Sequence, residues 1–236
     1  MRKSAHRRAG VFAGVIALLA AVLVFCRAGE AGSSAQAEAA IARVPADSLA
    51  SALLETVRGA DPVVCELAVR AVDGRHGWSS TADELAGVGT PLTPLQRATI
   101  QWAVEGEEET AGASAVAPLV AGLQDPDPCV RRMAALKLGR TGDPRGIAAL
   151  RAAIVAPGVE QRAVGALGLG YAEDPAAIDD LGDALDDASP EVRAAATWAL
   201  GEIEDARAIP LLIPVLSGDE DPGVRQVAAW ALGSIE

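Results

Sequence analysis

A repeat with a period of about 31 residues constrains the fold of this chain more than any other feature. An arginine opens each repeat of the pattern, and a glycine follows it eight residues later. The four pairs are Arg131 and Gly139, Arg162 and Gly170, Arg193 and Gly201, and Arg225 and Gly233. Aliphatic residues keep the same period at Val116, Ile147, Ile178 and Ile209, and again at Leu119, Leu150, Leu181 and Leu212. Such a period predicts a solenoid, in which each unit buries its apolar face against its neighbours.

Each repeat has the pattern of two helices, as residues 143–171 illustrate. Asp143 is a capping residue and Pro144 suits the first helical position, where its missing N–H costs nothing. Apolar residues at helical spacing then form a stripe that ends at Pro157-Gly158, and a second helix follows through Arg162. The same helix-start signal recurs at Asp127-Pro128, Asp174-Pro175, Ser189-Pro190 and Asp221-Pro222. We therefore predict alternating antiparallel helices of about twelve residues.

Three segments at these positions resemble HEAT-like repeats of the short bacterial type, the kind also found in phycobilisome lyases. They read DPDPCVRRMAALKLG, SPEVRAAATWALGEI and DPGVRQVAAWALGSI. The resemblance is strong from Ser114 onward and weaker upstream, where Asp61-Pro62 opens a degenerate unit with Cys65 in the arginine position and PLTPLQRATIQWAVEG forms another around Arg97. It implies an all-α fold, an α-α superhelix of about six helix-pair repeats, and contact with other proteins. It implies no particular activity, because a fold does not fix a function.

The N-terminus has the features of a targeting segment. Arg2, Lys3, Arg7 and Arg8 precede an apolar, uncharged run from Ala9 to Cys26. This pattern is typical of a cleaved signal peptide, a retained membrane anchor or, with Cys26 as the modified residue, a lipidated one. We expect a leader or N-terminal apolar helix in residues 1–28, a flexible linker in 29–45, degenerate repeats in 46–110 and regular repeats in 111–236. All versions place the repeats on the extracytoplasmic side, in the cell envelope.

The charge of the chain excludes one class of partner. The formal net charge is −12, and five of the 20 basic residues lie in residues 1–27, so residues 28–236 carry 15 basic and 32 acidic side chains, a net −17. An acidic body repels nucleic acid phosphates, which argues against the nucleic-acid-binding branch of HEAT-like proteins. A protein partner with a basic surface remains open; the alternative is that the charge serves solubility alone.

Catalytic and metal-binding patterns are missing from the sequence. The two histidines are His6 in the leader and His76 in an expected loop, and there is no His-Glu pair of the kind that holds iron in the HEAT-like deoxyhypusine hydroxylases. No serine stands in a GxSxG turn and no CxxC pair exists. We therefore expect no enzyme, no cofactor and no metal. We also expect Cys65 and Cys129 to be packing residues or free thiols, because they begin second helices two units apart along a linear stack.

Candidate binding residues lie on two surfaces. The first is the inner surface formed by the second helices, with Arg131, Arg162, Arg193, Arg225, Glu191, Thr197 and Gln226. A structural role is the favoured interpretation of the arginines: pairing with turn aspartates such as Asp143, Asp174 and Asp205 would join neighbouring units. The second surface is the apolar face of the C-terminal repeat, with Trp230 and Ile235, where a partner or a second copy of the chain could dock.

These observations predict a non-catalytic interaction scaffold, exported and tethered by its N-terminus. Two alternatives stay open. One is a lyase-like or chaperone-like module that presents a substrate, which would need a concave pocket with convergent polar groups. The other is a structural protein that self-assembles as a homodimer through its C-terminal repeat.

Overall fold

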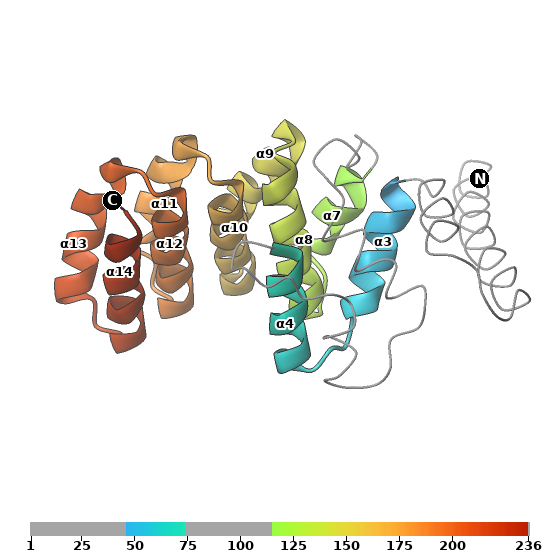
Figure 1. The fold of residues 1–236 in the computed structure, drawn as a ribbon, viewed down its shortest axis with the longest axis horizontal. Helices are drawn as coiled ribbons and strands as arrows, with labels where there is room; N and C mark the ends of the chain where they lie inside the picture. Colours follow the sequence, from blue (N-terminus) through green and yellow to red (C-terminus); the bar gives the residue numbers. More distant parts are fainter. Residues whose placement is uncertain (1–45, 74–114, 236) are drawn as a thin grey trace, which may run out of the picture.

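The structure, a computed structural model, describes residues 46–73 and 115–235 and is built entirely from helices in those ranges (Figure 1). Consecutive helices pair into units. The pairs are α3 (Ala46–Val57) with α4 (Pro62–Asp73), α7 (Val116–Gly122) with α8 (Pro128–Thr141), α9 (Pro144–Ile154) with α10 (Val159–Ala172), α11 (Ile178–Ala184) with α12 (Pro190–Ile203), and α13 (Ile209–Gly218) with α14 (Pro222–Ser234). Short 3-10 turns, Pro175–Ala177 and Ala206–Ala208, lead into α11 and α13. The predicted all-α solenoid of helix pairs is confirmed.

The helix starts follow from the capping residues that the sequence showed. At six of the described helix starts an Asp or Ser side chain accepts a hydrogen bond from a backbone N–H two or three residues later. These caps are Asp127, Asp143, Asp174, Ser189, Asp205 and Asp221. A proline follows the cap in five of the six cases, where its missing N–H leaves no donor unsatisfied. The second helices α8, α10 and α12 end at a residue with positive φ: Gly142, Glu173 and Glu204.

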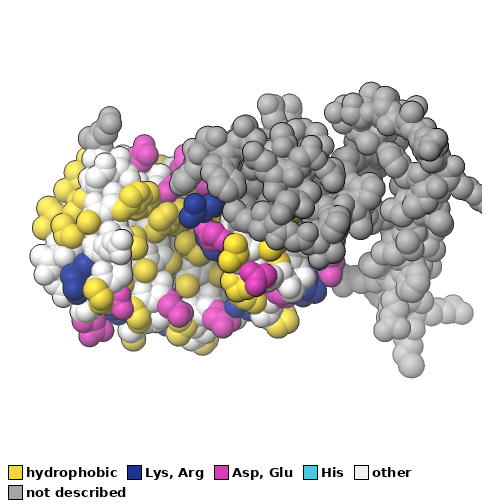
Figure 2. Space-filling model, turned by 60° about the horizontal axis from the view of Figure 1, so that its bottom comes forward, with side chains coloured by type: hydrophobic (Ala, Val, Ile, Leu, Met, Phe, Trp, Pro, Cys, Tyr) yellow, Lys and Arg dark blue, Asp and Glu magenta, His cyan; other side chains and the backbone are white. Residues whose placement is uncertain are grey.

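The second helices pack tightly against one another, whereas the first helices spread apart. α8 contacts α10, α10 contacts α12 and α12 contacts α14 along much of their length, while α9 and α11 barely meet. Figure 1 shows the units from α7–α8 to α13–α14 side by side in a row, in chain order. Figure 2 shows acidic and hydrophobic side chains intermixed on one face, with hydrophobic ones gathered at the end formed by α13 and α14 (left).

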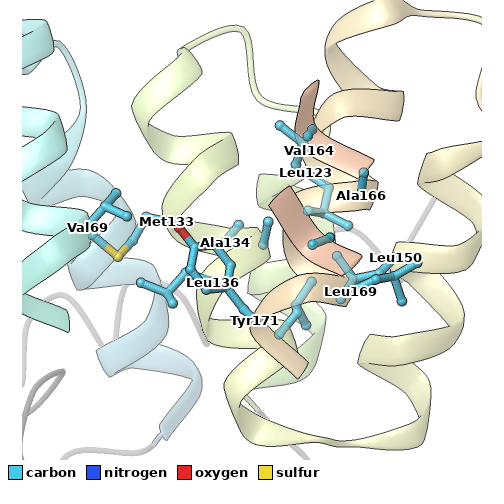
Figure 3. Close-up of a cluster of buried hydrophobic side chains, with 14 of the residues drawn as sticks. Val69, Leu123, Met133, Ala134, Leu136, Leu150, Val164, Ala166, Leu169 and Tyr171 are labelled. Carbon is cyan, nitrogen blue, oxygen red and sulfur yellow. The ribbon is translucent and has the colours of Figure 1, made fainter. Parts of the chain in front are cut away.

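A continuous core runs through the stack. The repeated leucines Leu119, Leu150, Leu181 and Leu212 are at most 2% exposed, which confirms the predicted phase of the first helices. The second helices contribute Met133, Leu136 and Leu169, all fully buried, and Figure 3 shows these packed between α4, α8 and α10. Because each unit buries its apolar face against the next, the stability of the stack depends on contacts between units.

Four expectations concern residues outside the described ranges. The leader in residues 1–28, the linker in 29–45 and the boundary near residue 110 all lie there, as does the unit around Arg97. Within residues 46–73 and 115–235, no helix combines the length and hydropathy needed to span a bilayer. The N-terminal anchor therefore stays a prediction from sequence.

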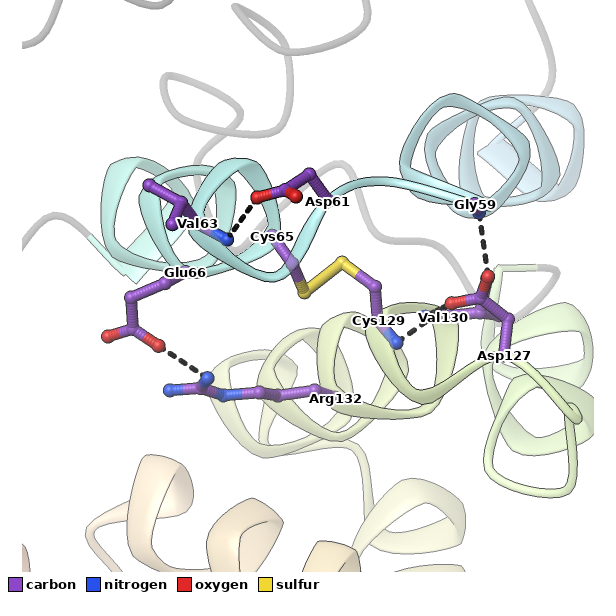
Figure 4. Close-up of a disulfide and its surroundings, with 9 residues drawn as sticks. All are labelled: Gly59, Asp61, Val63, Cys65, Glu66, Asp127, Cys129, Val130 and Arg132. Carbon is purple, nitrogen blue, oxygen red and sulfur yellow. Dashed lines mark hydrogen bonds and ion pairs between the residues drawn. A yellow bond between two sulfur atoms is a disulfide. The ribbon is translucent and has the colours of Figure 1, made fainter. Parts of the chain in front are cut away.

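The expectation for the cysteines was wrong. Cys65 in α4 and Cys129 in α8 form a disulfide, with their Cα atoms 5.7 Å apart, although 64 residues separate them in the sequence (Figure 4). The physical reason is that α3 and α4 pack directly on α7 and α8. The unit at residues 46–73 is thus a spatial neighbour of the unit at 116–141, and the two cysteines lie on facing helices.

The disulfide should contribute a large share of the stability of this end of the solenoid. Closing a loop of this length restricts the unfolded chain by about 4 kcal/mol. We expect a reductant to lower the free energy of unfolding by that order, measured by guanidinium denaturation. In the control, Cys65→Ala with Cys129→Ala, the reductant should change nothing. Equal stability of the wild-type protein with and without reductant would show that the bond does not form.

Truncating a core leucine tests the helix phase. Leu181 is fully buried, so Leu181→Ala should cost about 2–5 kcal/mol in the free energy of unfolding. Val155 is 77% exposed, and Val155→Ala serves as the control, with an expected change within about 0.5 kcal/mol. Chemical denaturation of the two variants measures both values. Equal effects would mean that the assigned face of α11 is incorrect.

Candidate interaction surface

The repeated arginines bind the turn that precedes their own helix. In each unit the Nη1 group donates to the backbone carbonyls five and six residues earlier. The acceptors are Asp125 and Pro126 for Arg131, Ala156 and Pro157 for Arg162, Asp187 and Ala188 for Arg193, and Asp219 and Glu220 for Arg225, at 2.7–3.4 Å. These carbonyls lie between the two helices of a unit and have no helical partner. The arginine therefore fixes the angle at which the second helix begins.

The other edge of the same guanidinium binds the next unit. Arg162 donates from Nε and Nη2 to Asp187 at 2.6 and 3.0 Å, and Arg193 does the same to Asp219 at 2.8 and 3.0 Å. Each carboxylate also accepts the backbone N–H of the following cap residue, Ser189 or Asp221. One arginine thus joins its own turn to the turn of its neighbour, using the planar, five-donor geometry that lysine lacks.

The structural role of the arginines agrees with the favoured interpretation, but the predicted partners were wrong. Asp143, Asp174 and Asp205 cap first helices and accept hydrogen bonds from backbone N–H groups in their own units. Asp143 and Asp205 also pair with the arginine two residues later, and this hydrogen bond lowers the pKa of each to about 2. They lie between units in the sequence, whereas the inter-helix turn of the next unit is the segment that reaches each repeated arginine.

Arg131 departs from this pattern because the next turn has no aspartate. Ala156 stands where Asp187 and Asp219 stand in later units, so Arg131 instead contacts Glu160 in the first turn of α10, with Nη2 to Oε2 at 2.7 Å. Its Nε is buried and has no hydrogen-bond partner in the described structure. A carboxylate on the helix reaches only one edge of the guanidinium.

Cys65 occupies the arginine position of the α3–α4 unit, and a different arginine takes over the bond to the next turn. Arg58, at the end of α3, contacts Asp125 through Nη1 and Nη2 at 2.8 and 2.9 Å. The hydrogen bond from Arg58 lowers the pKa of Asp125. The cysteine then bonds covalently to Cys129, and Glu66 beside it forms an ion pair with Arg132 of α8 (Figure 4). This interface keeps the carboxylate pairing and adds a covalent link.

The pairing predicts an acid-sensitive contact between units. Arg193 holds the pKa of Asp219 below its ordinary 3.8, and Arg162 does the same to Asp187. A folded-state pKa below the unfolded value means that the stabilisation is fully present above about pH 4 and is lost as the pH falls through the lowered pKa.

We therefore expect Asp219→Asn to reduce the loss of unfolding free energy between about pH 5 and pH 2, because the substituted side chain no longer takes up a proton. Asp183→Asn, at an exposed residue of α11, is the matched control and should leave the wild-type slope unchanged. Chemical denaturation across this pH range gives the slopes. Identical slopes for the two variants would contradict the assigned pairing.

A second repeated feature, glycines covered by aromatic residues of the next unit, lets the second helices approach closely. A Cβ on Gly170 would lie 2.8 Å from the Ala199 Cα and 2.9 Å from the Trp198 ring, and one on Gly201 would meet Ala231 and the Trp230 ring equally closely. Trp198 also packs edge-on against Tyr171, with ring centroids 4.9 Å apart. Trp198 and Trp230 therefore each lie over a glycine of the preceding second helix.

Two glycines in equivalent positions should respond oppositely to substitution. Gly201→Leu forces a side chain against the backbone of α14 and should cost about 3 kcal/mol. Gly233 has open space around it, so Gly233→Leu should be neutral or stabilise α14 by up to about 1 kcal/mol through helix propensity. Thermal and chemical unfolding compare the variants. A similar loss in both would show that close helix approach is not what the glycine provides.

The remaining predicted binding residues divide into buried and exposed ones. Thr197 is fully buried and donates to the Arg193 carbonyl, and Ile235 is 7% exposed, so neither side chain is placed to meet a partner. Glu191 and Gln226 are exposed, and Trp230 is 43% exposed; their roles in binding stay predictions. In the described ranges no group of three or more His, Cys, Asp or Glu side chains is arranged to hold a metal ion.

Sequence reasoning missed the carboxylates that join the units, namely Asp125, Asp187 and Asp219. Their signal was present in the sequence, because each stands two residues before a capping Asp or Ser that precedes a proline. It also missed Arg58, which has no repeated counterpart. Nothing in the 31-residue period marks this position.

The helix pairs, with their repeated arginines and glycines, define an α-solenoid. Comparison with known families supports this class. HEAT repeats match residues 91–167 and 156–233, which together make up more than half of the chain. The chain belongs to the HEAT-repeat family.

Comparisons with individual proteins add less. No curated protein matches the chain. Among solved structures, it is similar to the complex of CpcE and CpcF of phycocyanin lyase from Nostoc sp. PCC7120, with 24% identity and a TM-score of 0.44. The alignment covers 72% of this chain and 64% of that one, so the chain spans less than two thirds of the matched protein.

Proposed function

We propose that this protein is a non-catalytic scaffold that binds another protein and works in the cell envelope, tethered by its N-terminus. The observation that carries the proposal is the HEAT solenoid itself, a stack of helix pairs in which the repeated polar residues are used to join the units. Solenoids of this kind offer extended surfaces to other proteins. The residue types that usually perform acid–base catalysis near neutral pH are scarce, since the chain has two histidines.

The disulfide supports the envelope location. Disulfides persist in oxidising compartments and are rare in the cytosol, where thiols are kept reduced. Cys65 and Cys129 are bonded and largely buried, at 8% and 3% exposure, as a structural disulfide requires. Together with the basic and apolar leader of residues 1–26, this favours export, with residues 46–235 outside the cytoplasm.

The acidic surface supports a partner with a basic face. Residues 28–236 carry a formal net charge of −17, from 15 basic and 32 acidic side chains. A field of this sign accelerates the encounter with a positively charged protein and is screened by salt. We therefore expect association with the partner to slow as salt rises from about 0.05 to 0.5 M.

Affinity capture from the source cell tests the scaffold. The bait is residues 36–236 with an N-terminal tag, in oxidised form, applied to solubilised envelope and cytosolic fractions at low and moderate salt. We expect one stoichiometric protein from the envelope fraction. Recovery of the bait without a bound protein from every fraction would contradict the scaffold. A bait that is itself dimeric by light scattering would favour self-assembly through the C-terminal repeat.

Thiol trapping in intact cells tests the location separately. A maleimide reagent is added before and after reduction, and its mass shift counts free thiols. We expect Cys65 and Cys129 to react only after reduction, with the Cys65→Ala, Cys129→Ala chain as the control. Free thiols at both positions in the living cell would contradict export.

A further inference from the structure

The side of α13–α14 that faces away from α11–α12, here called the outer face, repeats the positions that inner units use for stacking. On α11, Gly182 faces the next unit: a Cβ there would lie 3.3 Å from Leu211 Cδ1. The equivalent residue 31 positions later is Ile213, which is 54% exposed. Leu185, the C-cap residue of α11, packs against a small core of α13 and α14, formed by Val215, Val224 and Ala228. Its equivalent, Leu216, is 38% exposed.

The second helix of the unit shows the same relation. Ala194 of α12 packs against that small core, and Thr197 is fully buried. Their equivalents 32 residues later on α14 are Gln226 and Ala229, and both are exposed. Gly233 completes the set, because a Cβ there would meet nothing within 4 Å, whereas Gly201 is covered by Trp230 and Ala231.

Arg225 gives the outer face a specific polar group. Its Nη1 binds the carbonyls of Asp219 and Glu220, as every repeated arginine binds its own turn. Its Nε and Nη2 have no partner in the described structure, although the same atoms of Arg193 bind Asp219 in two parallel hydrogen bonds. The guanidinium is therefore fixed in place with its carboxylate-binding edge open.

We propose that the outer face docks a helix-pair repeat of a second protein, one whose inter-helix turn supplies a carboxylate to Arg225. The proposal rests on the scaffold function above and names the class of partner. The α13–α14 unit shows what such a partner brings when it stacks on α11–α12: Asp219 for the arginine, Trp230 with Ala231 over the glycine, and aliphatic side chains against the leucine. A carboxylate is required because a bidentate arginine site selects planar, two-oxygen acceptors.

A second copy of this chain stacked head to tail fits this face poorly. The first described unit, α3–α4, has Gly59 where Asp219 supplies its carboxylate and Arg70 where Trp230 supplies its ring. These residues offer neither the carboxylate that Arg225 would bind nor the aromatic ring that would cover Gly233. The partner therefore needs a repeat of a different sequence.

Site-specific photo-cross-linking in the source cell tests the proposal on the full chain. A benzophenone-bearing phenylalanine analogue replaces Ile213, and a matched control chain carries it at Val155, which is also exposed but lies between α9 and α10. We expect a cross-link from position 213 to a helix-pair repeat of another protein, identified by peptide mass spectrometry. A further chain with the analogue at Ala229 serves as a second reporter on the same face.

Gly233→Glu provides the decisive comparison. A Cβ at this position meets nothing within 4 Å, so the fold should be unchanged, while a docked repeat would be displaced. We expect the cross-link to fall at least about tenfold. A cross-link to a second copy, to a protein without helix-pair repeats, or to nothing from either reporter would overturn the proposal. If affinity capture still yields the same partner with Gly233→Glu, the scaffold stands and the outer face is not its docking site.

Discussion

The stacking of the units depends on one repeated residue, the arginine that binds the turn before its own helix and, at Arg162 and Arg193, the carboxylate of the next turn. Helix pairs stacked by apolar contact alone could slide or rotate, because such contact is not directional. The guanidinium of Arg193 removes this freedom, because it donates both to two carbonyls of its own unit and to both oxygens of Asp219. The repeated glycines work with it, because the helices must come close before the arginine can reach the neighbouring turn. The arginine–carboxylate bonds set the orientation of one unit relative to the next. Burial of the leucines supplies most of the stabilisation.

The sequence predicted the parts of the fold that are local and periodic. Caps such as Asp127 and Ser189 act within three residues, so their signal is complete in a short window, and the buried phase of Leu181 follows from the period. Contacts between units were harder to predict. The partner of Arg193 is 26 residues away, and choosing Asp219 over Asp205 needs the direction in which the turns face. The Cys65–Cys129 bond could not be predicted from the repeat, because it depends on α3–α4 packing directly on α7–α8.

The two ends of the described solenoid differ in a way that bears on function. At the α3–α4 end the arginine position holds a cysteine, and the interface is closed by a disulfide and by Arg58. At the α13–α14 end the arginine and the glycine are both in place, with an open guanidinium edge and no side chain over the glycine. A disulfide at this interface suits a protein that works in an oxidising compartment. The exposed Arg225 and Gly233 suit recognition of another repeat, since the geometry for stacking is already formed.

A double-mutant cycle on Arg193 and Asp219 tests the central claim most directly. Free energies of unfolding are measured for the wild-type protein, Arg193→Met, Asp219→Asn and the double variant. Both side chains are at most 9% exposed, so the pair is shielded from solvent. We expect a coupling energy of about 1–3 kcal/mol between the two substitutions, because each one alone removes the contact between units. Effects that simply add would show that the arginine acts only within its own unit.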